Sequence, residues 1–265
     1  MVKSKVDGRA SQEASVRSVE RSAAILGALA DQPMSIAEAA ARVDLHTSTV
    51  HRLLGTLVKL GWVEQSARTA RYRLAPGLLG LSALGLAPHP LLTGGHEVLR
   101  SLTDTFGYSC WLSVRVGRKT VALARAAGRL SGATAANYDF RVGRSHPAHT
   151  TADGKVLLAY LPNDERGQLL GGEPLERYTE RTITDLPSLE KELEIIRAKG
   201  YATDTGERWD FLRGVAVPVS GPRGRVSAAI VCLGRFELDE ENEKISQEMK
   251  LQVEALSERL NNGEF

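Results

Sequence analysis

The sequence predicts an α+β protein with two domains, a basic helical domain at residues 15–75 and a larger one at 88–265 in which helices are interspersed with hairpins. The length of 265 residues fits two domains at a typical size of roughly 150 residues each. Apolar residues recur at helical spacing near the N-terminus, whereas alternating runs bounded by Gly and Pro occupy much of the second half. The composition, 42% hydrophobic and 25% charged, excludes an intrinsically disordered chain.

The first domain follows a tail at residues 1–14 and begins with two predicted helices. Apolar residues at positions separated by three and four predict the first helix over 16–30. The second starts at a capping box, in which the Ser35 hydroxyl and the Glu38 carboxylate each satisfy a free backbone N–H group of the other residue. This helix is Ala-rich and is expected to end near Val43.

A third helix follows the break at Asp44 and is expected to end before Gly61, which suits a helix C-terminus. Two helices joined by a very short turn are typical of a helix-turn-helix. The predicted outward face of the third helix consists of small, polar or cationic residues: Thr47, Ser48, Thr49, His51, Arg52, Gly55 and Lys59. It has no acidic residue, so it could lie against DNA, with Arg52 binding guanine in a bidentate manner. The alternative is an ordinary solvated helix face.

A hairpin is predicted next, with strands at 63–65 and 71–74 joined by a polar turn. Arg68, Arg71 and Arg73 lie on or beside its tip and could bind phosphate groups or enter a minor groove. Alternatively, these arginines keep an edge hairpin soluble. Residues up to position 75 hold eleven Lys and Arg against seven Asp and Glu, a net charge of +4, whereas the rest has −2. This asymmetry favours a polyanionic partner for the first domain.

The whole pattern resembles the IclR family of bacterial transcriptional regulators, from about Ser15 to Arg259. The N-terminal motifs that carry the resemblance are SVERSAAILGALA, MSIAEAAARVDLHTSTVHRLLGTLVKLGWVEQ and RYRLAPGLLGL. The C-terminal motifs are GRSHPAHTTADGKVLLAYLP and GYATDTGERWDFLRGVAVPVSGPRGRVSAAIVCLG. The resemblance implies a winged helix-turn-helix that binds operator DNA, a linker helix at 76–87, and a GAF-like effector domain with an antiparallel sheet flanked by helices. Ser35 joins the third-helix and hairpin residues as a predicted DNA contact.

The remaining elements can be placed from local patterns. The linker contains several leucines, too many for a short helix alone in water, and the resemblance favours a dimer contact over packing within the domain. Gly128 to Ala136 is predicted to be a loop. Helices are predicted up to about 106 and at 151–161, 188–199 and 240–260, and strands at 109–116, 119–126, 215–219 and 226–233.

A ligand site is predicted at the start of the 151–161 helix. The small polar run from Thr150 to Lys155 would present free N–H groups and the positive end of the helix dipole, which favour a carboxylate. The sequence therefore predicts a small organic acid as effector. By the resemblance, the effector-binding positions are Ala135, Tyr138, His146, Ala152, Asp153, Asp204, Gly214, Val231 and Leu233. Each could instead serve core or turn packing.

Several of these positions depart from the family pattern. Gly214 replaces a cysteine of glyoxylate- and pyruvate-sensing members, and Val231 and Leu233 replace two serines. We therefore expect a larger and less polar pocket, and an effector with an apolar or aromatic body. Asp153 adds a carboxylate where small residues are common, and it could repel an anion or accept a hydrogen bond from a hydroxyl or amine.

Enzymatic chemistry has weak support in the sequence. His146, His149 and Asp153 form the densest group of possible metal ligands or bases, but the histidines precede the predicted helix and do not share a face with Asp153. The sequence shows no phosphate-binding loop, nucleophile elbow or paired-cysteine motif. We expect neither catalysis, metal nor cofactor. The alternatives are a metal-dependent sensor or enzyme fused to a winged helix, and a protein-interaction module whose winged helix has lost DNA binding.

The predicted setting is cytoplasmic. No apolar run is long enough to span a membrane, and the N-terminal stretch lacks the apolar core of a secretory signal. Cys110 and Cys232 lie in apolar, strand-like runs and are expected to be buried thiols, with a disulfide as the alternative. The resemblance further implies a homodimer, and commonly a tetramer formed from two dimers.

Overall fold

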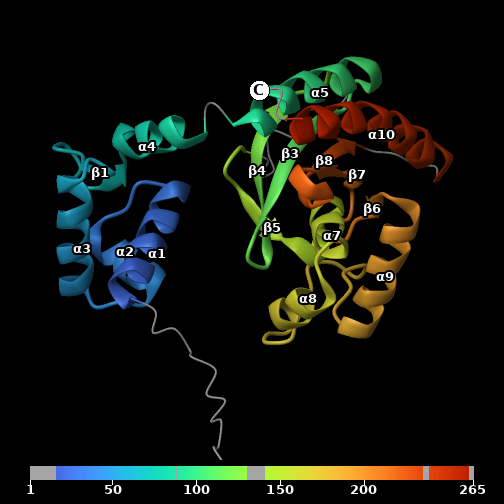
Figure 1. Cartoon of the computed structure of the whole chain (residues 1–265). Coiled ribbons are helices and arrows are strands. Elements are labelled where there is room, and N and C mark those ends of the chain that lie inside the picture. The colour runs from blue at the N-terminus through green and yellow to red at the C-terminus, as the bar shows by residue number, and fades with distance from the viewer. Residues whose placement is uncertain (1–15, 87–88, 130–140, 235–238, 263–265) are drawn as a thin grey trace, which may run out of the picture. The chain divides into compact units, whose positions relative to one another are not determined.

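The computed structural model describes residues 16–86, 89–129, 141–234 and 239–262 (Figure 1). The chain divides into two compact units, Met1–Leu86 and Ala87–Phe265, which are described separately. None of the helices in the described ranges has the length and apolar character needed to cross a membrane.

The first unit is a three-helix bundle with a hairpin and a following helix. Its elements are α1 (Arg17–Asp31), α2 (Ile36–Val43), α3 (Thr47–Lys59), β1 (Val63–Gln65), β2 (Tyr72–Leu74) and α4 (Pro76–Leu86). The predicted capping box is confirmed, since the Glu38 N–H donates to Ser35 Oγ and the Ser35 N–H donates to the Glu38 carboxylate. Asp44 adopts a left-handed conformation that ends α2 and allows the tight turn into α3.

The hairpin is tied to the helices by backbone contacts. Val63 pairs with Leu74 and Gln65 with Tyr72 in an antiparallel register. Tyr72 also forms a bridge with Met34, just before α2. The Tyr72 side chain and Val63 join the buried core of this unit, which includes residues of α1, α2 and α3. The helices and hairpin therefore form one packed winged helix-turn-helix.

The second unit is built on a single antiparallel sheet of six strands in the order β5-β4-β3-β8-β7-β6. Its strands are β3 (Ser109–Val116), β4 (Lys119–Ala126), β5 (Ser145–Pro147), β6 (Ala202–Asp204), β7 (Arg213–Ser220) and β8 (Val226–Gly234). Its helices are α5 (Pro90–Phe106), α7 (Ala152–Ala159), α8 (Asn163–Leu170), α9 (Leu186–Lys199) and α10 (Asp239–Asn262), with short 3-10 turns η2 (Ala148–Thr150) and η3 (Pro222–Gly224).

Helices cover both faces of this sheet, which confirms the predicted α+β class (Figure 1). On one face, α5 and α10 pack on a core that contains Leu112 and Ile230. On the other face, α7 and α9 pack on a core that contains Trp111 and Val231. Alternation along β3 and β8 sends neighbouring side chains to opposite faces. The same strands therefore contribute to both cores.

No residue range was predicted from the sequence for three elements: β5, α8 and β6. The two strands have only three residues each, so they offer no alternating pattern long enough to detect. Helix α8 is mostly polar, and its buried residues are Arg166 and Leu170, so it lacks a clear apolar stripe. Most of the loop predicted at Gly128 to Ala136 lies outside the described residues.

The prediction of two buried thiols is confirmed. Cys110 and Cys232 are free and buried, and they lie opposite each other on β3 and β8. Their sulfur atoms contact each other. This hydrogen bond and the burial of the site raise the pKa of the Cys232 thiol, so the pair belongs to the apolar core at neutral pH.

Candidate functional site

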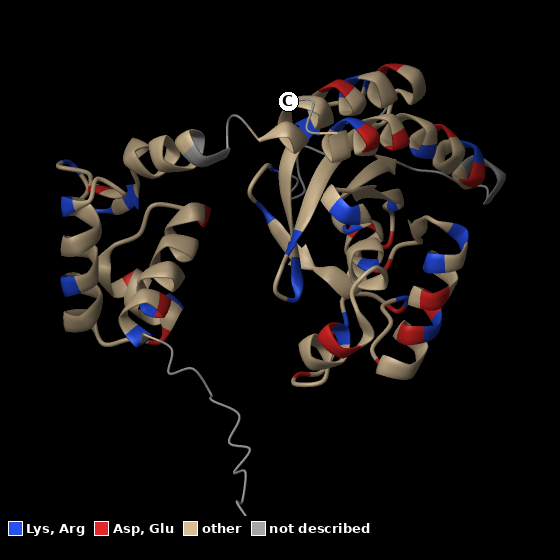
Figure 2. Ribbon diagram, in the orientation of Figure 1, with Lys and Arg blue, Asp and Glu red and all other residues tan. Residues whose placement is uncertain are grey.

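The exposed face of α3 contains Lys and Arg but no Asp or Glu (Figure 2). Thr47, Ser48, His51, Arg52 and Lys59 are exposed, and Thr49 is half-buried. The Arg52 guanidinium has no hydrogen-bond or ion-pair partner within the described part of the chain, so it is available to a ligand. The opposite side of the helix is held in the core by Val50, Leu54 and Leu57. Burial of this apolar side fixes which residues of α3 face outward.

The beginning of α3 has a cap that sequence reasoning did not identify. His46 precedes the helix, and its Nδ1 atom accepts from the Ser48 N–H at 3.3 Å. The same nitrogen lies 2.7 Å from the Ser48 hydroxyl oxygen. Histidine is an uncommon N-cap, and nothing in the sequence pattern distinguished it from the polar residues around it. This cap orients Ser48 at the end of the helix where free N–H groups favour phosphate.

The three hairpin arginines differ in their surroundings. Arg71 donates to the Pro33 carbonyl oxygen at 2.8 Å and to the Glu38 carboxylate at 2.7 Å. Arg73 forms an ion pair with Glu64 across the hairpin. Arg68 is exposed in the turn and forms no hydrogen bond or ion pair with the residues that the structure describes. Arg68 is therefore the hairpin arginine that is most available to a phosphate group.

Ser35 was predicted as a DNA contact, and in the structure its hydroxyl accepts the hydrogen bond that caps α2. Because a hydroxyl oxygen has two lone pairs and one proton, the cap still allows it to donate to an external oxygen. Glu38, three residues later, raises the local negative charge. Its pKa is lowered by hydrogen bonds from Ser35 and by Arg71.

A pocket in the second unit lies between the sheet and the start of α7. The cavity itself is small, about 30 Å³, and the empty space reaches about 450 Å³ only when the gaps between its lining atoms and its open mouth are included. Its walls come from β3, β4, β5, β6, β8, the start of α7 and the segments before β5 and after β6. The lining residues are Trp111, Ser113, Thr120, Ala122, Arg141, His146, Thr151, Asp153, Asp204, Trp209, Leu212, Val231 and Leu233.

Five of the nine predicted effector positions line this pocket, and they come from separate parts of the chain: His146, Asp153, Asp204, Val231 and Leu233. Ala135 and Tyr138 lie outside the described residues. Ala152 and Gly214 do not line the pocket. Ala152 is instead buried in the core beneath α7.

We expected a larger pocket because Gly214 has no side chain where relatives have a cysteine, and the structure does not agree with this expectation. A Cβ atom at this position would lie 2.7 Å from Leu233 Cδ2. Gly214 and Leu233 face each other on β7 and β8, so the leucine side chain occupies the space that glycine leaves. The glycine in place of a cysteine therefore makes room for the apolar side chain of Leu233 and does not add volume to the pocket.

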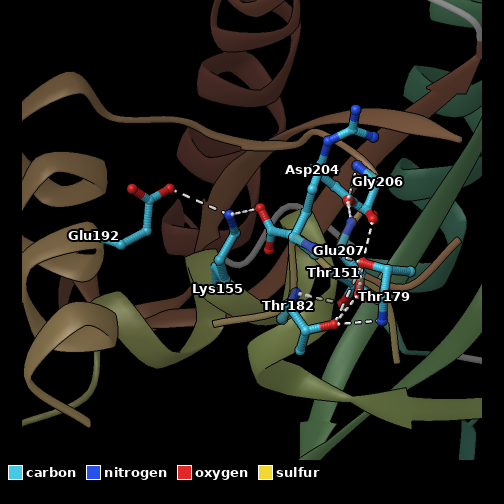
Figure 3. Close-up of polar contacts among 10 residues, drawn as sticks. Thr151, Lys155, Thr179, Thr182, Glu192, Asp204, Gly206 and Glu207 are labelled. Atoms are coloured by element: carbon cyan, nitrogen blue, oxygen red, sulfur yellow. Dashed lines mark hydrogen bonds and ion pairs between the residues drawn. The ribbon is translucent and has the colours of Figure 1, made fainter. Parts of the chain in front are cut away.

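A buried ion-pair network lies behind the pocket (Figure 3). Lys155, on α7, is 1% exposed, and its Nζ donates to Glu207 at 2.7 Å and to Glu192 at 3.2 Å. Burial opposes the charge on Lys155, but the two glutamates outweigh it and raise the pKa of the lysine. This network fastens α7 to α9 and to the segment that follows β6.

Asp204 connects the network to the pocket. Its Oδ1 accepts from the N–H groups of Gly206 and Glu207 at 2.9 and 2.8 Å. Burial and the nearby Glu207 carboxylate raise the pKa of Asp204 to about 7. The hydroxyls of Thr179 and Thr182 donate to the carbonyl oxygens of the same turn (Figure 3). Asp204 is thus a pocket residue whose carboxyl group also holds the turn.

The sequence predictions missed the residues that form the pocket walls, above all Trp111 and Trp209. The alternation of side chains along a strand could have indicated part of the wall, because Trp111 and Ser113 are two residues apart and therefore lie on the same face of β3. On β4 the alternation is broken by a bulge. Leu112 pairs with Ala124 and Ser113 with Ala122, so Leu123 is the additional residue. Ala122 therefore faces the pocket, whereas Ala124 faces the opposite core.

The histidines of the possible metal group are separated. His146 lines the pocket, where its ring packs edge-on against Trp209. The Nε2 atom of His149 lies 3.0 Å from the carbonyl oxygen of Glu176, and burial lowers the pKa of this histidine. Within the described ranges, no three His, Cys, Asp or Glu residues are close enough to hold a metal ion.

Comparisons with known proteins agree with this architecture. The family model of the IclR helix-turn-helix domain matches residues 18–67, and the model described as bacterial transcriptional regulator IclR C-terminal matches residues 86–260. The chain is 34% identical over 220 residues to the HTH-type transcriptional regulator KdgR of Escherichia coli, covering 83% of this chain and 82% of that protein. It is 31% identical to the glycerol operon regulatory protein of Streptomyces coelicolor, covering 84% and 86%.

Solved structures show the same fold. A putative IclR transcriptional regulator from Silicibacter sp. TM1040 matches with a TM-score of 0.80 and 26% identity, covering 92% of this chain and 96% of that chain. An IclR homologue from Microbacterium hydrocarbonoxydans, solved in complex with 4-hydroxybenzoate, matches with a TM-score of 0.75 and 22% identity, covering 91% and 99%. The second likeness concerns the fold alone.

Proposed function

The chain belongs to the IclR family of bacterial transcriptional regulators, whose members are regulators and not enzymes, and on this premise we propose that a small organic acid bound in the second unit controls its affinity for operator DNA. The observation that carries the proposal is the pocket at the start of α7, a concave site with apolar walls and a few polar groups. A ligand that binds one conformation of this unit better than another changes DNA affinity by its difference in affinity for the two.

The DNA contacts are assigned to α3 and the hairpin. Arg52 is exposed and unpaired within the described residues and is the residue that reads a base, whereas Thr47, Ser48 and Lys59 contact the backbone. Arg68 supplies the hairpin contact with phosphate. An operator bound in this way lies with the chromosome in the cytoplasm.

The proposed effector has an apolar or aromatic body. Trp111, Trp209, Leu212, Val231 and Leu233 supply apolar lining, which suits a ligand less polar than glyoxylate or pyruvate. The proposal also includes control of a catabolic operon, because an acid of this kind is a degradation intermediate in many metabolic routes.

The proposed assembly is a homodimer that pairs further into a tetramer. Helix α4 contains no charged residue, and Leu79, Leu81 and Leu84 are 70%, 55% and 85% exposed. A surface of this kind is costly to leave in water and is well suited to a second copy of the chain. Two winged helices in a dimer would bind a roughly palindromic operator.

The test is DNA binding by the full-length chain, measured as fluorescence anisotropy on promoter fragments from its own genomic neighbourhood. Arg52→Ala is expected to weaken specific binding by about 1–3 kcal/mol and to relax sequence preference at one base pair. Arg197→Ala, on the exposed surface of α9, is the matched control and should bind like the wild type.

The second arm adds carboxylic acids from two-carbon keto acids to aromatic acids. A selective change in DNA affinity supports the proposal. If DNA affinity is unchanged with every acid, the proposal of an acid effector is wrong. If DNA binding is weak and independent of salt concentration and sequence, the proposal of a DNA-binding function is wrong.

A further inference from the structure

Two carboxylate side chains line the pocket, and they differ in what they already bind. Asp204 accepts two backbone N–H groups and holds the turn after β6. Asp153 is only 8% exposed, yet within the described ranges it has neither a hydrogen-bond nor an ion-pair partner. Buried carboxylates are ordinarily paired or hydrogen-bonded, because removal from water disfavours the charge. Asp153 is therefore a largely buried carboxyl side chain in the first turn of α7 that lines the pocket without a side-chain partner among the described residues.

The cationic side chains near Asp153 already interact with other groups. Lys155 lies two residues further along α7, but its Nζ is bound by Glu207 and Glu192. Arg141 and His146 line the same pocket, and both already take part in other interactions. A compensating positive charge for Asp153 can come from a molecule that enters the pocket.

The walls around this carboxylate suit an organic cation. Trp111 and Trp209 both line the pocket, and the faces of indole rings attract cations. Each ring already has one arginine over it, since the guanidinium carbons of Arg125 and Arg208 lie 5.2 Å from the ring centroids of Trp111 and Trp209, so a ligand ammonium group would use the remaining face. Leu212, Val231 and Leu233 provide contact for a hydrocarbon part of the ligand. Ser113 adds a hydroxyl group that can donate to a ligand carboxylate, whereas the Thr120 hydroxyl already donates to the carbonyl oxygen of His146.

We propose that the ligand of this pocket carries a protonated amine that pairs with Asp153, so that the pocket selects an amino acid with an apolar side chain over the corresponding simple carboxylic acid. This inference rests on the proposed function and narrows its effector class. The carboxylate of a simple acid would approach Asp153 as a like charge, whereas a zwitterion brings the opposite charge to it.

The experiment measures binding by isothermal titration calorimetry with ligand pairs that share a carbon skeleton. The pairs are butyrate and 2-aminobutyrate, hexanoate and 2-aminohexanoate, and 3-phenylpropionate and phenylalanine; 2-phenylethylamine tests the amine alone. For at least one pair, the full-length chain is expected to bind the amino acid at least tenfold more tightly than the simple acid.

Three variants locate the effect. Asp153→Asn should abolish the preference for the amino acid, and Asp153→Glu should retain part of it. Asp164→Asn, which removes the same charge from an exposed position on α8, should leave the preference unchanged. Thermal unfolding of each variant without ligand establishes that it is folded.

Each result decides the proposal. Equal or tighter binding of the simple acids, an unchanged preference in Asp153→Asn, or no binding of any amino acid by the folded wild-type chain would overturn it. The panel also includes 2-hydroxyhexanoate; if it binds as tightly as 2-aminohexanoate, the proposal is overturned, because Asp153 then accepts a neutral donor and does not require a protonated amine. If simple acids bind and alter DNA affinity, this inference fails while the proposed function stands; if amino acids bind through Asp153 without altering DNA affinity, the reverse holds.

Discussion

Replacement of Lys155 by methionine tests the role of the buried network behind the pocket. Methionine keeps a long unbranched side chain but removes the charge that Glu207 and Glu192 share. Glu207 is 5% exposed, and its Oε2 atom has no hydrogen-bond partner among the described residues. The variant would therefore leave a buried carboxylate with no neighbouring cation, a change that typically costs 3–5 kcal/mol of stability.

The structure favours the lower end of this range at neutral pH. The Glu192 side chain is 30% exposed, so water can compensate for its lost contact. Burial already raises the pKa of Glu207, and without Lys155 that pKa rises further, which allows the carboxyl group to take up a proton. We expect a loss of about 3 kcal/mol at pH 7.5. A raised folded-state pKa gives stability that is present at low pH and lost as pH rises, so the loss should be smaller at pH 5.5.

The assay is urea unfolding followed by circular dichroism at the two pH values. The double variant Lys155→Met with Glu207→Gln removes both charges and should recover much of the lost stability. Lys191→Met, on the exposed side of α9, is the control and should change stability by less than about 0.5 kcal/mol. A loss below 1 kcal/mol in the single variant, or a double variant no more stable than the single one, would refute the reasoning.

Two further outcomes are expected. Burial and Glu207 raise the pKa of Asp204 from 3.8 to about 7, so its contribution to stability is present below pH 4 and is lost as pH rises through 7. In urea unfolding, the wild type should therefore lose on the order of 3 kcal/mol of stability between pH 5 and 8 relative to the Asp204→Asn variant. Parallel pH profiles of the two proteins would contradict this expectation. Arg68→Ala should reduce the slope of log affinity against log salt by about one unit in DNA titrations, whereas Arg73→Ala should change it less because Glu64 already pairs with Arg73; equal slopes for both variants would exclude a special role of Arg68.

Much of the first unit could be predicted from the sequence because its signals are local. The capping box at Ser35 and the apolar spacing of α3 each lie within one helical turn or a few turns, and both are confirmed. The state of the hairpin arginines was not predictable in this way. Arg71 finds its partners at Pro33 and Glu38, more than thirty residues away, through a tertiary contact.

The pocket was predictable only in part for the same reason. Resemblance indicated the start of α7 and the end of β8, where Asp153 and Leu233 line the pocket. The tryptophans come from β3 and from the segment before β7, which meet only after the sheet is assembled. The bulge at Leu123 also reverses the alternation of β4, and a single extra residue leaves no clear mark in the sequence.

The alternation of β3 has a consequence for how substitutions should be interpreted. Trp111 lines the pocket, while Cys110 and Leu112, its two chain neighbours, are buried in the core beneath α5. Any change in volume beneath that helix must tilt or shift the strand that carries the tryptophan. If the pocket binds the proposed effector, residues that never touch the effector can therefore change its selectivity, and a mutational search confined to the pocket wall would miss them.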